Sequence, residues 1–261
     1  MAHLFLIRKP SDAAGGSSGG GTHLWDLDEA STVVDGNGAL LFGWTSRWGT
    51  QTTPPTFDDY TLAKIAASGP ASQDALRFTY GAIAAQAYLG GEVTLTAPAF
   101  GVSRYFGGHI RINCLDYPND IHTCKHMIIA DQAANNRPIL VWGGRFGADP
   151  DYEMWLQLDG GGNVIKGPRF GNNVWHRWEI ELYPGNTASD TNGYYKIWAG
   201  PSSVTFTYAS PSDSTSGLSF AEVQRAQWGD IRLGFYHNDS VATADLTVDI
   251  CDNFAHSSFV P

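Results

Sequence analysis

Two glutamates on one expected strand are the first residues whose spacing suits catalysis. Glu179 and Glu181 lie two positions apart in the segment 174–183. In an extended strand they share a face, with carboxylates roughly 7 Å apart, because a strand rises about 3.3 Å per residue. Glycosidases use carboxylate pairs separated by about 5–9.5 Å. The alternative is a salt-bridged strand surface, with Arg177 on the same face and Lys196 across the following hairpin.

Two other expected strands each place polar side chains on one face. The first contributes His109, Arg111 and Asn113, and the second contributes Glu153, Trp155 and Gln157. On neighbouring strands of a concave sheet they would line a groove in which a ring stacks on a sugar and polar groups bind its hydroxyls. Trp155 is central because it points away from the apolar face of its own strand. The alternatives are a plain solvated face and a lyase site, in which a histidine or tyrosine takes the proton.

Cysteine and histidine motifs do not predict a metal centre. The sequence holds no Cys-x-x-Cys pair and no HExxH motif, so no transition metal is expected. Cys114 and Cys124 flank a loop that a disulfide could close, with buried thiols as the alternative. Cys251 completes an odd count, so at least one thiol stays unpaired in a monomer.

Short strands separated by turn residues must position these side chains. Period-two alternation, with one apolar face per strand, predicts antiparallel sheets packed on one side. The expected strands are 39–44, 75–80, 92–97, 105–114, 124–131, 138–142, 152–158, 174–183, 193–199, 204–208, 230–238 and 244–252. Short helices are expected at 61–67, 82–88 and 220–227. About a dozen strands predict an all-β fold, a two-sheet antiparallel jelly-roll sandwich.

Composition agrees with one such domain. Among 261 residues there are 30 Gly and 13 Pro, which disfavour a helix bundle, while 43% hydrophobic and 13% aromatic content excludes disorder along the whole chain. Residues 1–21 are expected to form a strand and a Gly/Ser linker, and 22–261 a single β-sandwich domain. The arm at 1–21 could add a strand to the sheet edge of another copy or another subunit.

Charge restricts the partners. The net charge of −10 argues against nucleic acid, because phosphate binding needs a positive surface. No apolar run approaches 18 residues, so no membrane insertion is expected. The first residues put their positive charge after a short apolar run, which is not the order of a secretory signal. We therefore expect synthesis in the cytoplasm and release by lysis.

Three linked segments carry a resemblance to a known family. They are VWHRWEIELY at 174–183, the hairpin from Asn186 through NGYYKIWAG at 192–200, and DICDNF at 249–254. Together they resemble the concanavalin A-like lectin/glucanase superfamily, in the polysaccharide-lyase-like and laminin-G-like variety, over roughly 75–256. The resemblance implies a jelly roll and a possible structural Ca²⁺ near the closing strand, with Asp249 and Asp252 as oxygen ligands. Otherwise these two are ordinary turn and capping acids.

The resemblance does not extend to catalytic motifs. The glucanases of the superfamily carry E-x-D-x-x-E and its alginate lyases carry R-x-E-x-R and Q-I-H, and none of these occurs here. Three functions therefore remain open: a virion component such as a phage capsid decoration or tail-fibre module, a free carbohydrate-binding lectin, and a polysaccharide lyase or glycoside hydrolase. The missing motifs and the N-terminus favour the first, a non-catalytic structural or binding module at a virion surface, with a glycan or other virion subunits as partners.

Overall fold

The computed structural model describes part of the chain in detail. The described residues are 23–26, 46–48, 60–80, 87–94, 96–114, 123–129, 138–143, 152–158, 163–171, 173–223, 230–237 and 246–261. The expected N-terminal arm at 1–21 and the expected strand at 39–44 lie outside them. Side chains are described over 64–79, 96–113 and 173–219, and in most of the C-terminal strand and tail.

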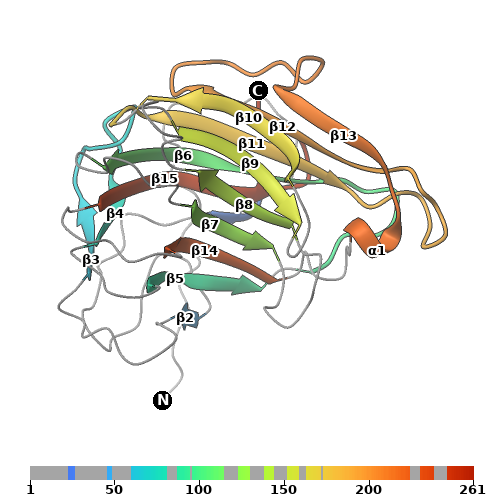
Figure 1. Cartoon of the computed structure of the whole chain (residues 1–261), viewed down its shortest axis with the longest axis horizontal. Helices are drawn as coiled ribbons and strands as arrows, with labels where there is room; N and C mark the ends of the chain where they lie inside the picture. The colour runs from blue at the N-terminus through green and yellow to red at the C-terminus, as the bar shows by residue number, and fades with distance from the viewer. Residues whose placement is uncertain are drawn as a thin grey trace.

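Two antiparallel sheets build the fold (Figure 1). The eight-stranded sheet runs in the order β13 (Asp213–Leu218), β12 (Gly193–Pro201), β11 (His176–Tyr183), β6 (Arg104–Cys114), β15 (Leu246–His256), β4 (Ala75–Tyr80), β3 (Tyr60–Ile65), with β1 (His23–Asp26) also paired to β15. The seven-stranded sheet runs in the order β10 (Asn163–Phe170), β9 (Tyr152–Leu158), β8 (Pro138–Gly143), β7 (Thr123–Ile129), β14 (Asp230–His237), β5 (Ala87–Thr94), β2 (Ser46–Trp48). The expected two-sheet jelly-roll sandwich is confirmed.

Two local expectations are wrong. Residues 204–208 alternate apolar and polar side chains like a strand, yet they form an irregular loop over the eight-stranded sheet. The expected helix at 61–67 is instead the edge strand β3, which pairs with β4. The third expected helix is shorter than predicted: α1 spans Phe220–Val223, and Ser219 begins it by donating both its N–H and its hydroxyl to the carboxylate of Glu222. Among the described residues, no helix could cross a membrane.

The apolar face of the eight-stranded sheet forms the core. Register brings large apolar side chains together across β4, β15, β6, β11 and β12, so that Ile180 pairs with Phe106 on one side and Ile197 on the other. These residues are almost completely buried, as a sheet face packed in a sandwich requires. The group comprises Leu76, Phe78, Phe106, Ile110, Ile112, Trp178, Ile180, Leu182, Tyr195, Ile197, Val248 and Ile250.

The opposite face of the same sheet, which we call the polar face, carries most of the charged side chains of these strands. The loop at 202–212 and the tail at 257–261 lie over this face. Arg177 donates to the backbone carbonyls of both covering segments, at Val204 (3.3 Å) and Val260 (2.8 Å). Phe206 lies beneath the same guanidinium, 4.6 Å from its centre. Polar side chains of the sheet are therefore buried without belonging to the apolar core.

A tight hairpin sets the register of β11 against β12. Gly185 takes a positive φ of 84°, and the carboxylate of Asp190 accepts hydrogen bonds from the backbone N–H groups of Asn186 and Thr187. The result is direct pairing of Glu181 with Lys196, as the sequence predicted.

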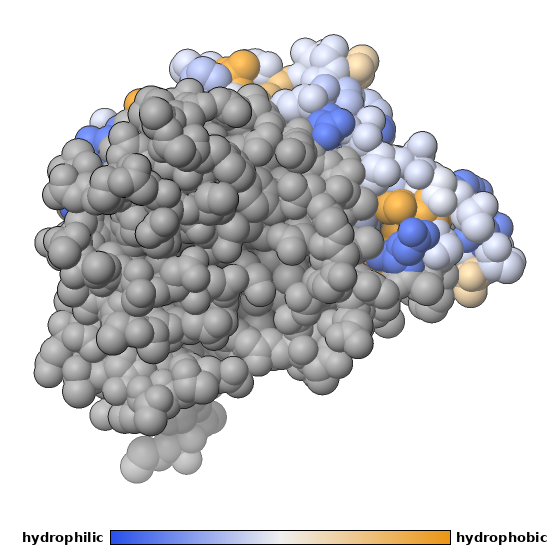
Figure 2. Space-filling view, viewed as in Figure 1, coloured by the Kyte–Doolittle hydropathy of each residue, from blue (hydrophilic) through white to orange (hydrophobic). Residues whose placement is uncertain are grey.

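On the face seen in Figure 2, the surface of the described residues is mainly hydrophilic and includes a few hydrophobic residues.

Candidate functional site

Glu181 is the centre of a cluster of hydroxyl groups on the polar face. Its side chain is 1% exposed. Its Oε1 accepts hydrogen bonds from Ser103 Oγ (2.6 Å), Tyr105 OH (2.8 Å) and Tyr194 OH (2.9 Å). Tyr208 OH donates to the same carboxylate, 3.1 Å from Oε2. A carboxylate offers about four lone-pair sites, so these four hydroxyls saturate it.

Lys196 joins this cluster, which we call the Glu181 cluster: Glu181, Ser103, Tyr105, Tyr194, Tyr208 and Lys196. The Lys196 ammonium donates to Tyr208 OH at 2.9 Å and lies 3.4 Å from Glu181 Oε2. It also stands 4.2 Å from the centre of the Tyr208 ring and 4.8 Å from that of Tyr194. Partial burial alone would lower the pKa of Lys196, but the Tyr208 hydroxyl and the Glu181 carboxylate together raise it. The cation stays charged at neutral pH.

The tyrosines of the cluster differ in exposure. Burial, followed by the negative charge of Glu181, raises the pKa of the Tyr105 hydroxyl, and burial raises that of Tyr194 as well. Both hydroxyls are therefore fixed donors to the carboxylate. Tyr208 is 41% exposed, and Tyr183 stacks on Tyr194 with ring centres 4.8 Å apart. The cluster thus presents aromatic surface and one ammonium group at its outer side, and the buried Glu181 carboxylate fixes these groups in place.

Glu179, the other member of the expected carboxylate pair, is completely buried. Its side chain is 0% exposed, and its Oε1 accepts a hydrogen bond from the backbone N–H of Val260 at 2.9 Å. Oε2 has no hydrogen-bond partner among the described residues, and Arg177 Nη2 lies 3.9 Å from it. Burial raises the pKa of Glu179 to about 8, against a smaller lowering by Val260 and Arg177. The two carboxylates share a face, and the expected cations lie near them, Arg177 by Glu179 and Lys196 by Glu181. Because both carboxylates are buried, they form neither an open catalytic pair nor a solvated surface.

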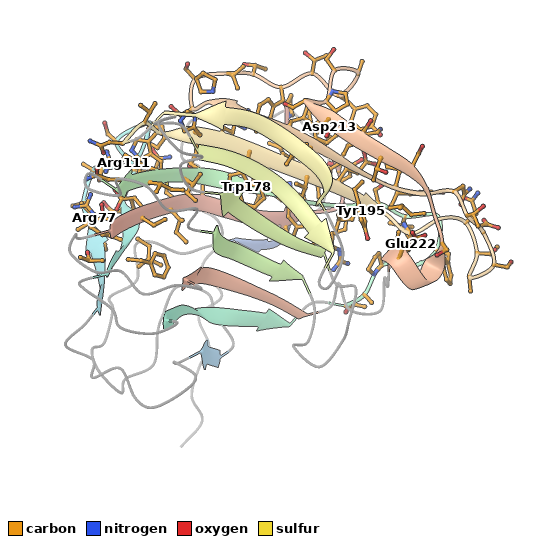
Figure 3. The ribbon with its side chains drawn as sticks, in the orientation of Figure 1. Arg77, Arg111, Trp178, Tyr195, Asp213 and Glu222 are labelled. Carbon is orange, nitrogen blue, oxygen red and sulfur yellow. The ribbon has the colours of Figure 1, made fainter. Side chains whose placement is uncertain are left out.

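An arginine–aspartate network lies at one end of the sheet, where Figure 3 shows Arg77 and Arg111 close together and far from Tyr195. Both guanidiniums bind Asp249, which is 1% exposed: Arg77 at 2.6 and 2.8 Å, and Arg111 through Nε at 2.9 Å. Arg111 also donates to Ser68 and stacks over the Trp175 ring at 4.8 Å. Arg111, expected to bind a ligand, is thus held by protein groups. Two cations at Asp249 disfavour a calcium ion there.

The expected groove is divided between the two sheets. His109, Arg111 and Asn113 share one face of β6, as the alternation predicted, and His109 and Asn113 are half-buried there. Glu153, Trp155 and Gln157 belong to β9, whose neighbours are β8 and β10 of the other sheet. The expectation that the two strands neighbour each other is therefore wrong, because alternation fixes faces but not strand order. The side chains of β9 lie outside the described part, as do those of Cys114 and Cys124.

His109 lies beside Cys251 and Asp252. Cys251 is its partner across the β6–β15 ladder, and a shift of register between Cys251 and Phe254 follows directly. Asp252 takes a positive φ of 49° at this irregularity, and its Oδ2 lies 3.7 Å from His109 Nδ1. Burial, partly offset by Asp252, lowers the pKa of His109, so the ring is neutral at pH 7.

Sequence reasoning missed the tyrosines around Glu181. Tyr194 and Lys196 alternate on the strand opposite Glu181, and this signal was readable once the hairpin was placed. Ser103 and Tyr208 come from segments with no periodic relation to β11, so only the folded chain brings them to the cluster. A carboxylate that accepts hydrogen bonds from three tyrosines corresponds to no fixed spacing of residues in a sequence, so no motif search would find it.

Comparison with known proteins adds support for the fold. No protein-family model matches the sequence, and no curated protein matches it. Among solved structures, the chain is similar to a carbohydrate esterase from the Shiga toxin-encoding bacteriophage phi24B, at 14% identity over 92% of this chain and 100% of that one, with a TM-score of 0.53. It is also similar to a GH131 β-glucanase catalytic domain from Podospora anserina, at 15% identity over 92% and 98% of the two chains, with a TM-score of 0.49. At these identities such similarities show the fold alone, and the phage structure supports the two-sheet β-sandwich described above.

Proposed function

We propose that this chain is a non-catalytic surface module that binds a neutral or weakly acidic glycan at the Glu181 cluster. The observation that carries the proposal is the saturation of Glu181. A carboxylate that already accepts four hydroxyl hydrogen bonds is a poor base or nucleophile, but it orients the rings that surround it. Tyr208 stacks on Trp198 and has the Lys196 ammonium over its ring, yet it is 41% exposed. A sugar would pack its C–H groups against the exposed part of this ring, while its hydroxyls accept hydrogen bonds from the ammonium.

Charge restricts the ligand. The chain carries a net charge of −10, which repels polyanions, while Lys196 supplies one local cation beside Tyr208. A neutral sugar, or one with a single carboxylate, fits these two conditions better than a highly sulfated or polyuronic chain.

The sealed position of Glu179 argues against a hydrolase built on the expected pair. A retaining or inverting glycosidase needs both carboxylates at the substrate, and here the backbone of Val260 covers one of them.

We further propose that the module works on a virion, as a capsid decoration or tail-fibre component released by lysis. The phage origin of one structure with the same fold, at a TM-score of 0.53, supports this setting. That phage protein is a carbohydrate esterase, so an enzyme on the same fold is the competing hypothesis.

A glycan array probed with the purified full chain tests the binding proposal. We expect selective binding to neutral or weakly acidic glycans, with loss of signal in Tyr208→Ala and retention in Val174→Ala, a control at a residue that is 48% exposed. Incubation with each bound glycan should release neither unsaturated sugar, reducing ends nor acetate. Product formation would overturn the non-catalytic assignment, and absence of the protein from particles purified out of a lysate would overturn the virion setting.

A further inference from the structure

We propose that His109, Cys251 and Asp252 bind a zinc ion. Their ligand atoms all lie within 4.8 Å of one another, on the polar face and separate from the Glu181 cluster. Two atoms bound to one tetrahedral zinc ion stand roughly 3.3–3.6 Å apart, as its Zn–S, Zn–N and Zn–O bond lengths require. The His109 Nδ1 to Asp252 Oδ2 distance of 3.7 Å is close to this range. Side-chain rotations, with Asp252 the most exposed of the three residues, would bring the ligand atoms to bonding distance.

The backbone explains how two successive residues reach one site. Neighbouring residues of a regular strand face opposite sides of the sheet. The register shift after Cys251, with Asp252 in the left-handed region at φ 49°, turns Asp252 to the side that Cys251 and His109 occupy. A non-glycine residue costs free energy in this conformation, and such residues concentrate at functional sites.

The surroundings of His109 fit a metal ligand. Nδ1 is buried and has no hydrogen-bond partner among the described residues, and it lies 3.7 Å from Asp252 Oδ2. With the proton on Nε2, the Nδ1 lone pair would be free to bind the ion. Metal-bound histidines commonly hold this tautomer by donating the other N–H to a carbonyl or a carboxylate.

Gln73 provides an outer contact. Its Oε1 accepts from the backbone N–H of Ala71 at 2.7 Å, which fixes the amide so that Nε2 faces the cluster. Nε2 donates to Asp252 Oδ2 and lies 3.8 Å from Cys251 Sγ. Such a donor would hold the carboxylate in place when the metal is bound.

The ligand chemistry selects zinc over calcium. A thiolate and an imidazole suit a borderline-soft ion, whereas calcium takes six to eight oxygen atoms. Binding would form the Zn–S bond and release the thiol proton to solvent. The thiolate and carboxylate then balance the charge of Zn²⁺, and a water takes the fourth position. Arg177, a cation whose charge acts on His109, faces Glu179 and the carbonyls of Val204 and Val260.

The test measures metal binding by the full chain, first cleared of metal with a chelator under reducing conditions. Calorimetry with Zn²⁺ alone should give one site per chain, weakened at least tenfold in Asp252→Asn, His109→Gln and Cys251→Ser. Asp190→Asn, which changes a turn carboxylate elsewhere, should bind Zn²⁺ as the parent does. With Co²⁺ as a probe, a thiolate-to-metal charge-transfer band should appear in the parent and in a Cys114→Ser/Cys124→Ser variant, and disappear in Cys251→Ser.

Several results would overturn the assignment. One is Zn²⁺ binding of equal strength in the parent and in Asp252→Asn. Because the Asp252 side chain is 51% exposed, this variant should fold even if Cys251→Ser does not. Another is the absence of any site for Zn²⁺. A third is Ca²⁺ binding that exceeds Zn²⁺ binding and depends on Asp252, which would indicate an all-oxygen site.

Discussion

The backbone N–H of Val260 donates a hydrogen bond to the carboxyl group of Glu179 at 2.9 Å, and this contact joins the C-terminal tail to the centre of the eight-stranded sheet. Arg177 reinforces the join by donating to the carbonyl of the same residue at 2.8 Å. Phe259 extends it, since its ring lies 4.8 Å from that of Trp198 and 5.4 Å from that of Tyr208. The tail is therefore part of the polar face and a support of the Glu181 cluster.

Stability should fall with rising pH because of Glu179. Burial raises its pKa to about 8 from an ordinary value of 4.5. The folded chain thus holds a proton that the unfolded chain releases, so the contribution is complete below pH 4.5 and is lost as pH rises to 8. From about pH 6 to pH 9 we expect the unfolding free energy of the parent to fall by on the order of 2 kcal/mol more than that of Glu179→Gln, which has no proton to lose. Urea denaturation of both proteins at the two pH values measures this difference. An equal change in unfolding free energy for the two proteins would contradict it.

Glu181→Gln should destabilise the fold. The new amide offers one acceptor oxygen and a donor NH₂ group where the carboxylate accepted from Ser103, Tyr105, Tyr194 and Tyr208. Buried hydroxyls without acceptors cost about 1–3 kcal/mol. The measurement is the urea midpoint at fixed pH.

Glu222→Gln is the matched control for that change. Glu222 is an exposed acceptor at the start of α1, a position where glutamine also serves. We expect a change within about 0.5 kcal/mol. Equal losses in the two variants would show that Glu181 is no more than a surface carboxylate.

Calcium should not stabilise the protein through Asp249. Arg77 and Arg111 already occupy its two oxygens. Addition of Ca²⁺ to metal-free protein should leave the thermal midpoint unchanged, whereas Asp249→Asn should cost about 3 kcal/mol because two partly buried guanidiniums lose their counterion. A calcium-dependent rise in the midpoint of the parent, absent in Asp249→Asn, would restore the calcium site that the family resemblance implies.

Gly107 should not tolerate a side chain. A Cβ built there would stand 2.3 Å from the ring of Phe254, its partner across the ladder. We expect Gly107→Ala to cost about 1–3 kcal/mol through displacement of that ring. Gly171→Ala is the control, because its nearest neighbour would be Val174 at an ordinary 3.5 Å. Similar thermal midpoints for both variants would contradict the packing of Phe254 on Gly107.

Alternation in the sequence was enough to predict the strands β4, β6 and β9 and the faces of β11. It did not reveal the burial of Glu179 and Glu181, because the segments that cover them, such as the loop with Tyr208, come from distant parts of the chain. The same loop looks like a strand because its apolar residues alternate. Strand order also escaped prediction, which is why β6 and β9 were expected side by side.

Mutation of Tyr208 tests the central claim, that the Glu181 cluster holds an aromatic platform for a sugar. Calorimetric titration with the best glycan from the array should show a loss of about 1–3 kcal/mol in Tyr208→Ala, as for one stacked aromatic contact. Tyr208→Phe should lose less, because it keeps the ring but not the hydrogen bonds to Lys196 and Glu181. Unchanged affinity in Tyr208→Ala, with an unfolding midpoint equal to that of the parent, would contradict the account.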